Sequence, residues 1–270
     1  PQPSAPEITY SSSSFSFVKG VSIQNIVPTN DGGEVSAWSI HPQLPTGLQF
    51  SSVTGTISGT PSILSESEVY TINATNDVAI NSTTITIEVI DQLPSISYTP
   101  SNLQLYQSVE ISQQIPTNNG GAVVSWNIDP QIPDGLIFST TTGIISGTPS
   151  NSQTSTQYTI TGENSGGNNS TSISIEIIAA PVLSYSTSTF VFTKSQSINS
   201  ISPSNSGGDA TSWSISPDLP QGLQLDSSTG VITGTPSQVS SQKFYTVNAS
   251  NPAGYSQSVL QIEVVDIPPS

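Results

Sequence analysis

The chain has 270 residues, of which 3 are basic (all lysine) and 18 are acidic, so its formal net charge is −15 at pH 7. This charge repels phosphate backbones and anionic lipid headgroups, which excludes nucleic acid and acidic membrane surfaces as partners. The lack of cysteine excludes a disulfide framework and thiolate metal sites. No apolar run reaches the roughly 18 residues of a membrane-spanning helix, so no segment is suited to direct membrane insertion.

A long internal repeat sets the domain organisation. The segment at residues 44–62 returns twice with few changes, at 132–150 and 219–237. The repeats are 88 and 87 residues long, a period typical of an array of whole domains rather than of a small solenoid unit. We therefore predict three domains, with the boundaries 1–92, 93–180 and 181–267.

The linkers between the repeats are short. Only Gln92 and Leu93 separate the first two aligned units, and Ala180 alone separates the second and third. Such links leave little freedom, so we expect neighbouring domains to touch. Pro268 matches the proline that opens each repeat, and residues 268–270 are therefore expected to begin a further linker or repeat of a longer array.

In chain order, the first repeat contains short segments in which apolar and polar residues alternate, a pattern typical of strands with one buried face. Turn signals rich in Gly, Asn and Pro separate these segments. About seven short strands and one tryptophan in a unit of this size indicate a β-sandwich of immunoglobulin (Ig) type. The predicted strands are 15–18, 21–26, 35–40, 48–50, 56–58, 69–76 and 82–89.

The repeated motif also resembles a known family. Residues 44–50 fit LPxGLxF, residues 54–61 fit TGxIxGTP, and a strand that begins at Tyr70 follows. This pattern is similar to the putative Ig-domain repeat family, bacterial and archaeal Ig-like domains related to dystroglycan-type cadherin-like domains. The resemblance covers almost the whole chain. It implies tandem Ig-like sandwiches in large secreted or surface proteins, often adhesins or stalks, and it implies no catalysis.

The predicted fold class is all-β, with three tandem Ig-like β-sandwich domains in an extended rod on the order of 110 Å long. In this fold the single tryptophan of each repeat packs between the two sheets. An exposed tryptophan that stacks on carbohydrate is the functional alternative. The predicted core tryptophans are Trp38, Trp126 and Trp213.

Signals for an enzyme are poor. His41 is the only histidine, and Asp129 and Ser216 stand at its positions in the other repeats. One loop histidine without cysteine offers neither a catalytic triad nor a metal cluster. The pair Glu66 and Glu68 lies in a polar segment without an aromatic pocket that would shift a pKa. We therefore predict no catalytic residues and no bound organic cofactor.

Calcium is the alternative that we keep open for the junctions. The end of one domain meets the top loops of the next, where carboxylate and amide oxygens are the ligands that Ca²⁺ takes. Against this reading, the chain has no DxNDN-like or DxD motif, and Ala179 replaces Asp91 at the second junction. The candidate calcium ligands are Glu88, Asp91 and Glu163, with Asn118 and Asn119 nearby.

The chain contains sequons for N-linked glycosylation, which would be used only in a secreted protein. A chain rich in Asn, Ser and Thr also produces sequons by chance. The alternation of Asn73 with the inward Ile72 favours exposure of that side chain. The possible glycosylation sites are Asn73, Asn81, Asn168, Asn169 and Asn248.

These observations predict a structural or adhesive segment of an extracellular, cell-surface repeat protein, such as a stalk, an adhesin or a fibre. The expected partners are other repeats of the array, other copies of the protein, or a surface glycan or protein. Exposed strand edges could pair copies into a filament. The alternatives are a calcium-stiffened cadherin-like adhesion module and a glycan-binding module.

Overall fold

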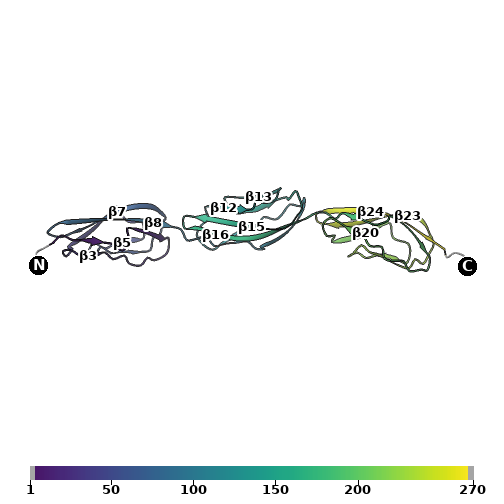
Figure 1. The fold of residues 1–270 in the computed structure, drawn as a ribbon, viewed down its shortest axis with the longest axis horizontal. Coiled ribbons are helices and arrows are strands. Elements are labelled where there is room, and N and C mark those ends of the chain that lie inside the picture. Colours follow the sequence, from purple (N-terminus) through teal and green to yellow (C-terminus); the bar gives the residue numbers. More distant parts are fainter. Residues whose placement is uncertain (1–3, 267–270) are drawn as a thin grey trace.

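The computed structural model describes residues 4–266 of the chain, so the predicted linker or repeat at 268–270 lies outside the described residues. Within 4–266 every regular element is a strand, and no helix is present that could cross a membrane. The strands form three all-β domains that follow one another in a line (Figure 1). The chain is therefore an extended rod of three Ig-like sandwiches.

Each domain is built on one four-stranded sheet. In the first domain its order is β2-β8-β7-β4, where β2 runs parallel to β8 and the other neighbours are antiparallel. The first and last long strands of the domain are therefore direct neighbours. The main-sheet strands are β2 (Ser14–Val18), β4 (Ala37–His41), β7 (Ser65–Thr75) and β8 (Ile80–Ile90), then β10 (Asn102–Tyr106), β12 (Ser125–Asp129), β15 (Gln153–Asn164) and β16 (Gly167–Ile178), then β18 (Thr189–Thr193), β20 (Ser212–Ser216), β23 (Ser240–Asn251) and β24 (Gly254–Val265).

The second layer consists of short strand pairs. In the first domain β5 pairs with β6, and β1 pairs with β3. The other domains repeat both pairs. These strands are β1 (Ile8–Thr9), β3 (Thr29–Asn30), β5 (Leu48–Phe50) and β6 (Ile57–Gly59), then β9 (Ile96–Ser97), β11 (Thr117–Asn118), β13 (Leu136–Phe138) and β14 (Ile145–Gly147), then β17 (Leu183–Ser184), β19 (Ser204–Asn205), β21 (Leu223–Leu225) and β22 (Ile232–Gly234).

The predicted strand at 21–26 was wrong as a continuous strand. The segment makes one isolated bridge, between Ile26 and Ile57, and the Ile23 amide donates to the Gly59 carbonyl at 3.0 Å. Its two isoleucines are three residues apart, so they do not follow the two-residue alternation of a strand. The segment therefore lies beside β6 and closes the second layer without a full ladder.

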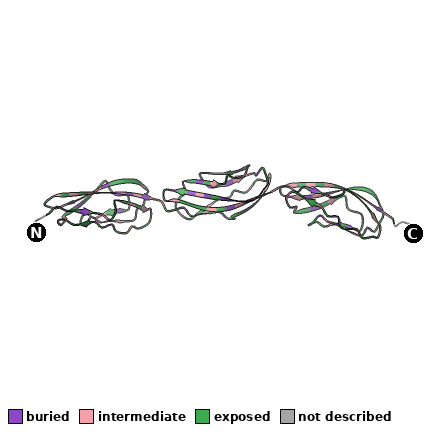
Figure 2. Ribbon diagram, in the orientation of Figure 1, coloured by how far each residue is buried: buried purple, intermediate pink, exposed green. Residues whose placement is uncertain are grey.

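The core of each domain lies between the two layers, and burial alternates along the long strands as the sequence pattern requires (Figure 2). On β8, Ile85, Ile87 and Val89 are at most 2% exposed. Each such side chain contributes about 1.5–3 kcal/mol by burial. The tryptophans lie in the same cores: Trp38 is 8%, Trp126 7% and Trp213 9% exposed.

A glycine packs against the face of each core tryptophan. Gly143 has φ +72°, and a Cβ added to it would lie 2.8 Å from Cδ2 and Cε3 of Trp126. Both the positive φ and the close approach therefore require glycine at this position. Gly55 and Gly230 meet Trp38 and Trp213 in the same way.

The carbonyl of the same glycine accepts a hydrogen bond from a tyrosine, which is buried in the second domain and half-buried in the other two. The Tyr98 hydroxyl donates to the Gly143 carbonyl, and its counterparts Tyr10 and Tyr185 donate to Gly55 and Gly230 at 2.5 and 3.4 Å. Burial raises the pKa of all three phenols, that of Tyr185 to about 12. The TG dipeptide of the repeated motif thus joins the tryptophan and the tyrosine of each core.

The packing of glycine on tryptophan predicts the effect of Gly143→Ala. We expect a loss of about 1–3 kcal/mol in the unfolding free energy of the second domain, because the methyl group is forced against Trp126 at a strained φ. Chemical denaturation followed by tryptophan fluorescence measures this. Gly20→Ala is the control, since Gly20 also has positive φ but has nothing within 4 Å of an added Cβ. Equal losses in the two variants would show that the tryptophan contact is unimportant.

The buried phenols predict loss of stability at alkaline pH. Burial raises their folded-state pKa above the unfolded value of about 10, so their contribution is complete below pH 10. It is lost as the pH rises from 10 through the raised values. Urea denaturation at pH 8 and pH 11 should show this decrease. Tyr98→Phe should cost about 1 kcal/mol at pH 8 and make the alkaline loss smaller; an unchanged pH dependence would contradict the assignment.

Candidate functional sites at the domain junctions and on the third domain

The first linker is held by hydrogen bonds from the second domain. Strand β8 ends at Ile90, and two residues later the Gln92 carbonyl accepts a hydrogen bond from Nδ2 of Asn164 at 2.7 Å. The next carbonyl, of Leu93, accepts from the Gly121 amide at 3.1 Å. Asn164 is only 7% exposed, and its Oδ1 accepts from the Gly166 amide at 2.8 Å. Both ends of this buried carboxamide are therefore satisfied.

Glycines allow the linker to lie directly on the second domain. A Cβ at Gly121 would overlap the Gln92 carbonyl, and one at Gly166 would overlap the Asp91 carbonyl. The Asp91 amide also donates to Oγ of Ser165 at 2.9 Å. The linker is thus in contact with two loops of the domain that follows it.

The second junction repeats this arrangement. Asn251, which is 8% exposed, donates from Nδ2 to the Ala179 carbonyl at 2.8 Å and to the Asp209 carbonyl at 3.0 Å. The Gly208 amide donates to the Ala180 carbonyl at 3.2 Å. Strand β16 ends at Ile178, so the residue directly after the strand, Ala179, is already hydrogen-bonded to the third domain.

The residues that enter the first domain are bound in the same way. Asn76 donates to the Ser4 carbonyl at 2.8 Å, and the Gly33 amide donates to the Ala5 carbonyl at 2.9 Å. The sequence analysis did not identify this contact. Its signal is present, because an asparagine recurs at 76, 164 and 251 and a Gly-Gly pair ends at 33, 121 and 208.

The candidate calcium ligands are not brought together. Glu88 lies within β8 opposite Ser16, and Glu163 lies on β15 opposite Asn168. Oδ1 of Asn118 already accepts hydrogen bonds from its own domain. Within residues 4–266, no group of three or more acidic or histidine side chains is placed to hold a metal ion.

The residues considered for catalysis are exposed and separate. His41, Glu66 and Glu68 all lie at the surface. Glu68 accepts a hydrogen bond from the Tyr70 hydroxyl at 3.1 Å. Burial of Tyr70 and this contact raise its pKa to about 12, so the phenol stays neutral at physiological pH.

The sequon asparagines lie on the long strands. Asn168 and Asn169 are exposed, while Asn73, Asn81 and Asn248 are half-buried. Some of these amides are engaged, since Oδ1 of Asn73 accepts from Ser82 Oγ at 2.7 Å and Oδ1 of Asn169 accepts from the Ile96 amide at 3.3 Å. Glycosylation stays a prediction for all five.

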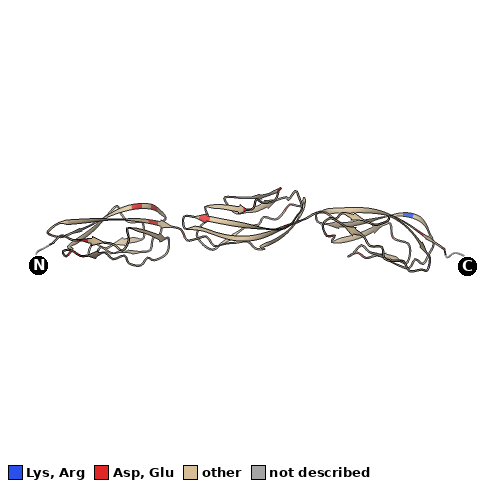
Figure 3. Cartoon of the chain, in the orientation of Figure 1, with Lys and Arg blue, Asp and Glu red and all other residues tan. Residues whose placement is uncertain are grey.

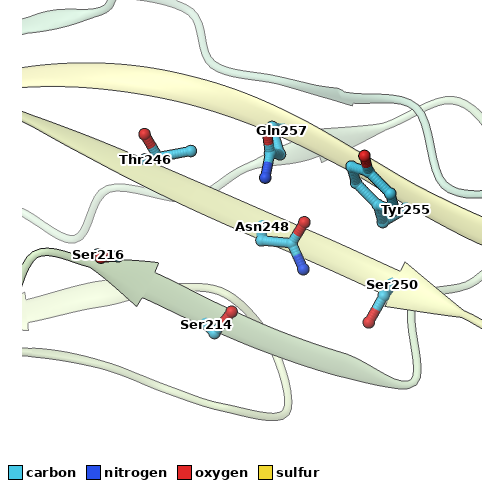
Figure 4. Close-up of a pocket in the computed structure, with 7 residues that line it drawn as sticks. All are labelled: Ser214, Ser216, Thr246, Asn248, Ser250, Tyr255 and Gln257. Carbon is cyan, nitrogen blue, oxygen red and sulfur yellow. The ribbon is translucent and has the colours of Figure 1, made fainter.

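An open groove lies on the outer face of the main sheet of the third domain (Figure 4). Its volume is about 620 Å³, within the size range of small-ligand sites. The side chains that line it project from one face of three neighbouring strands, and the ring of Tyr255 stands at one end. The lining residues are Ser214 and Ser216 on β20, Thr246, Asn248 and Ser250 on β23, and Tyr255 and Gln257 on β24.

The repeats, the fold and the recurring junction point to one family. Three consecutive segments match the family described as Putative Ig domain, at residues 4–90, 93–179 and 178–265. The chain belongs to this family. The predicted family is confirmed, whereas the relation of Putative Ig domains to dystroglycan-type cadherin-like domains stays a prediction.

Among curated proteins, these Putative Ig domains are similar to the serine-rich adhesin for platelets of Staphylococcus aureus, with 30% identity over 156 residues. The protein of the same name from strain MRSA252 matches equally well. The match covers 56% of this chain but only 7% and 11% of those two proteins. The chain thus corresponds to a small part of the relatives' length.

Among solved structures, the chain is similar to the N-terminal eight Ig domains of Down Syndrome Cell Adhesion Molecule, with a TM-score of 0.53 and 15% identity over 96% of this chain and 36% of that one. An I-band fragment of titin aligns with a TM-score of 0.49 and 16% identity, over 97% of this chain and 99% of the fragment. The first likeness supports the tandem Ig-like fold.

The junction geometry predicts that Asn164→Ala loosens the contact between the first two domains. The substitution leaves the Gln92 carbonyl and the Gly166 amide without their partner, which should cost the second domain about 1–3 kcal/mol. Chemical denaturation measures the loss, and fluorescence energy transfer between dyes on the two domains measures the spread of distances. Gln157→Ala, which changes an exposed side chain of β15 that does not contact the linker, is the control and should change neither the stability nor the distances by much. An unchanged distance distribution in Asn164→Ala would contradict the role of this residue.

Proposed function

We propose that this chain is a non-enzymatic spacer segment of a cell-surface adhesive protein, which holds other parts of that protein away from the surface. The family and the similarity to a part of a staphylococcal adhesin support this reading. The chemistry of the chain agrees, because its outer faces carry mainly hydroxyl and amide groups. We infer an extracellular location on the same grounds.

The contact at the linkers is the observation that carries the proposal. At both junctions the main chain that leaves one domain is hydrogen-bonded at once to the next domain. A linker fixed at consecutive carbonyls has few rotations left, so each domain constrains the direction of its neighbour. The row of domains in Figure 1 is the expected result. An array built in this way gains length with each added repeat.

The strand order suits a segment under tension. In each domain a strand near the start runs parallel to the last strand, with five paired residues. A pull on the two ends of the domain moves these strands in opposite directions. The hydrogen bonds between them then carry the load together rather than one after another.

The surface charge suits an array that stays extended. Acidic residues occur in all three domains and basic residues are few (Figure 3). Like charge along a rod opposes lateral association. The edge strands β4, β12 and β20 are also partly covered, since the amides of Trp38, Trp126 and Trp213 donate to loop carbonyls. Assembly into filaments through these edges is therefore less favoured.

Small-angle X-ray scattering of the full chain tests the spacer. Three domains whose last strands span up to 12 residues give a rod of about 120 Å, with a radius of gyration of about 35 Å. A compact chain of this length would have about 18 Å. We expect the larger value, unchanged between millimolar calcium and excess chelator. A radius near the compact value would refute the spacer, and extension only with calcium would favour the cadherin-like alternative.

A further inference from the structure

Two side-chain amides on the outer sheet face of the third domain make no hydrogen bond within the described part of the protein, whereas the side chains at these positions in the other domains do. Asn248 and Gln257 lie opposite each other on β23 and β24. Within residues 4–266, no internal hydrogen bond engages either carboxamide. In the other domains the equivalent side chains bond to each other. These closed pairs are Asn73 with Ser82, at 2.7 Å, and Thr161 with Ser170, at 2.8 Å.

The groove lacks the charged or titratable side chains that its counterparts carry, while Glu263 keeps an acidic group farther along the same face of β24. Ser216 stands where the first two domains have His41 and Asp129, and Ser250 stands where the second domain has Glu163. No Asp, Glu, His, Lys or Arg lines the groove. Carboxamides and hydroxyls both donate and accept hydrogen bonds, which suits a neutral ligand rich in hydroxyl groups.

An exposed aromatic ring stands at each end of this face. Tyr255 is 68% exposed beside the groove, while Ile80 and Asn168 occupy its position in the other domains. Phe244 is 66% exposed on the same side of β23. It lies six residues from Ser250, the partner of Tyr255, which is about 20 Å along a strand. Tyrosine is enriched at interfaces because it combines an apolar ring with a polar hydroxyl.

The main chain of this face is not available to a ligand. The strands β20, β23 and β24 are paired with one another along the groove. A peptide therefore cannot add a strand between them, and a ligand in the groove must be recognised by side chains; the outer edge of β20 lies outside the groove and is partly covered by the bond from the Trp213 amide to the Ser227 carbonyl. The groove lining contains no aliphatic side chain, and the one aliphatic side chain between the groove and Phe244 on this face of β24 is Val259, opposite Thr246.

We propose that the outer sheet face of the third domain binds a neutral oligosaccharide that lies along β23 from Tyr255 toward Phe244. A pyranose ring has an apolar C–H face, which stacks on the Tyr255 ring, and a rim of hydroxyls, which bond to Asn248 and Gln257. Acidic glycans are disfavoured by the net charge of −15. This proposal does not depend on the spacer function, because the extended shape of the rod is the same whether or not its third domain binds a glycan.

The test is a titration of the full chain with neutral hexasaccharides: β-1,4-glucan, α-1,4-glucan, β-1,4-mannan and β-1,4-galactan. The protein is produced without N-glycosylation, because a glycan on Asn248 would fill the groove. Two-dimensional ¹H–¹⁵N NMR follows the side-chain amides of Asn248 and Gln257 at millimolar sugar. We expect at least one hexasaccharide to shift both, and a hexasaccharide of sialic acid to shift neither.

Matched variants assign the site. Tyr255→Ala should weaken binding at least tenfold, while Asn168→Ala, at the equivalent position of the second domain, should leave it unchanged. Both residues are exposed, so equal melting temperatures show that the fold is intact. The proposal is overturned if no neutral hexasaccharide shifts these amides, if Tyr255→Ala binds as well as the wild type, or if only the acidic sugar binds. The scattering measurement is unaffected by any of these results.

Discussion

The hydrogen bond from a buried asparagine to the incoming linker determines how the domains are joined. Asn164 and Asn251 bind the carbonyls of Gln92 and Ala179, within two residues of the end of the preceding strand. Because the donor belongs to one domain and the acceptor follows directly from the other, the bond restricts the angle between them. The extended shape follows from this repeated contact, since a free two-residue linker would permit many orientations.

Each hydrophobic core is complete within its own domain, so the domains need no large interface with each other for stability. A few hydrogen bonds at each junction can then set how neighbouring domains are joined. The glycine that packs on the tryptophan also accepts the tyrosine hydrogen bond, and this unit recurs in every repeat. A repeat with a self-contained core can be duplicated without redesign of its neighbours. The outer faces are then free to differ, and the groove of the third domain, which lacks charged residues and has an exposed tyrosine at one end, is such a difference.

The strands that bury one face could be predicted from the sequence, because the alternation of apolar and polar residues is a local pattern. The alternation at Ile85, Ile87 and Val89 follows directly from strand geometry. The segment 21–26 failed as a strand because Ile23 and Ile26 are three residues apart, so it contacts β6 through single hydrogen bonds and not through a ladder. The junction contact was missed because Asn164 and Gln92 are distant in sequence and only the fold brings them together. The groove was likewise hidden, since its residues come from three strands.

The relative orientation of the domains is the quantity that tests the junctions most directly. Residual dipolar couplings of backbone amides in a weakly aligned sample report the alignment of each domain separately. If the asparagine contacts fix the junctions, all three domains of the wild type share one alignment tensor, and the double variant Asn164→Ala with Asn251→Ala gives three different ones. Three independent tensors in the wild type would contradict a rigid rod.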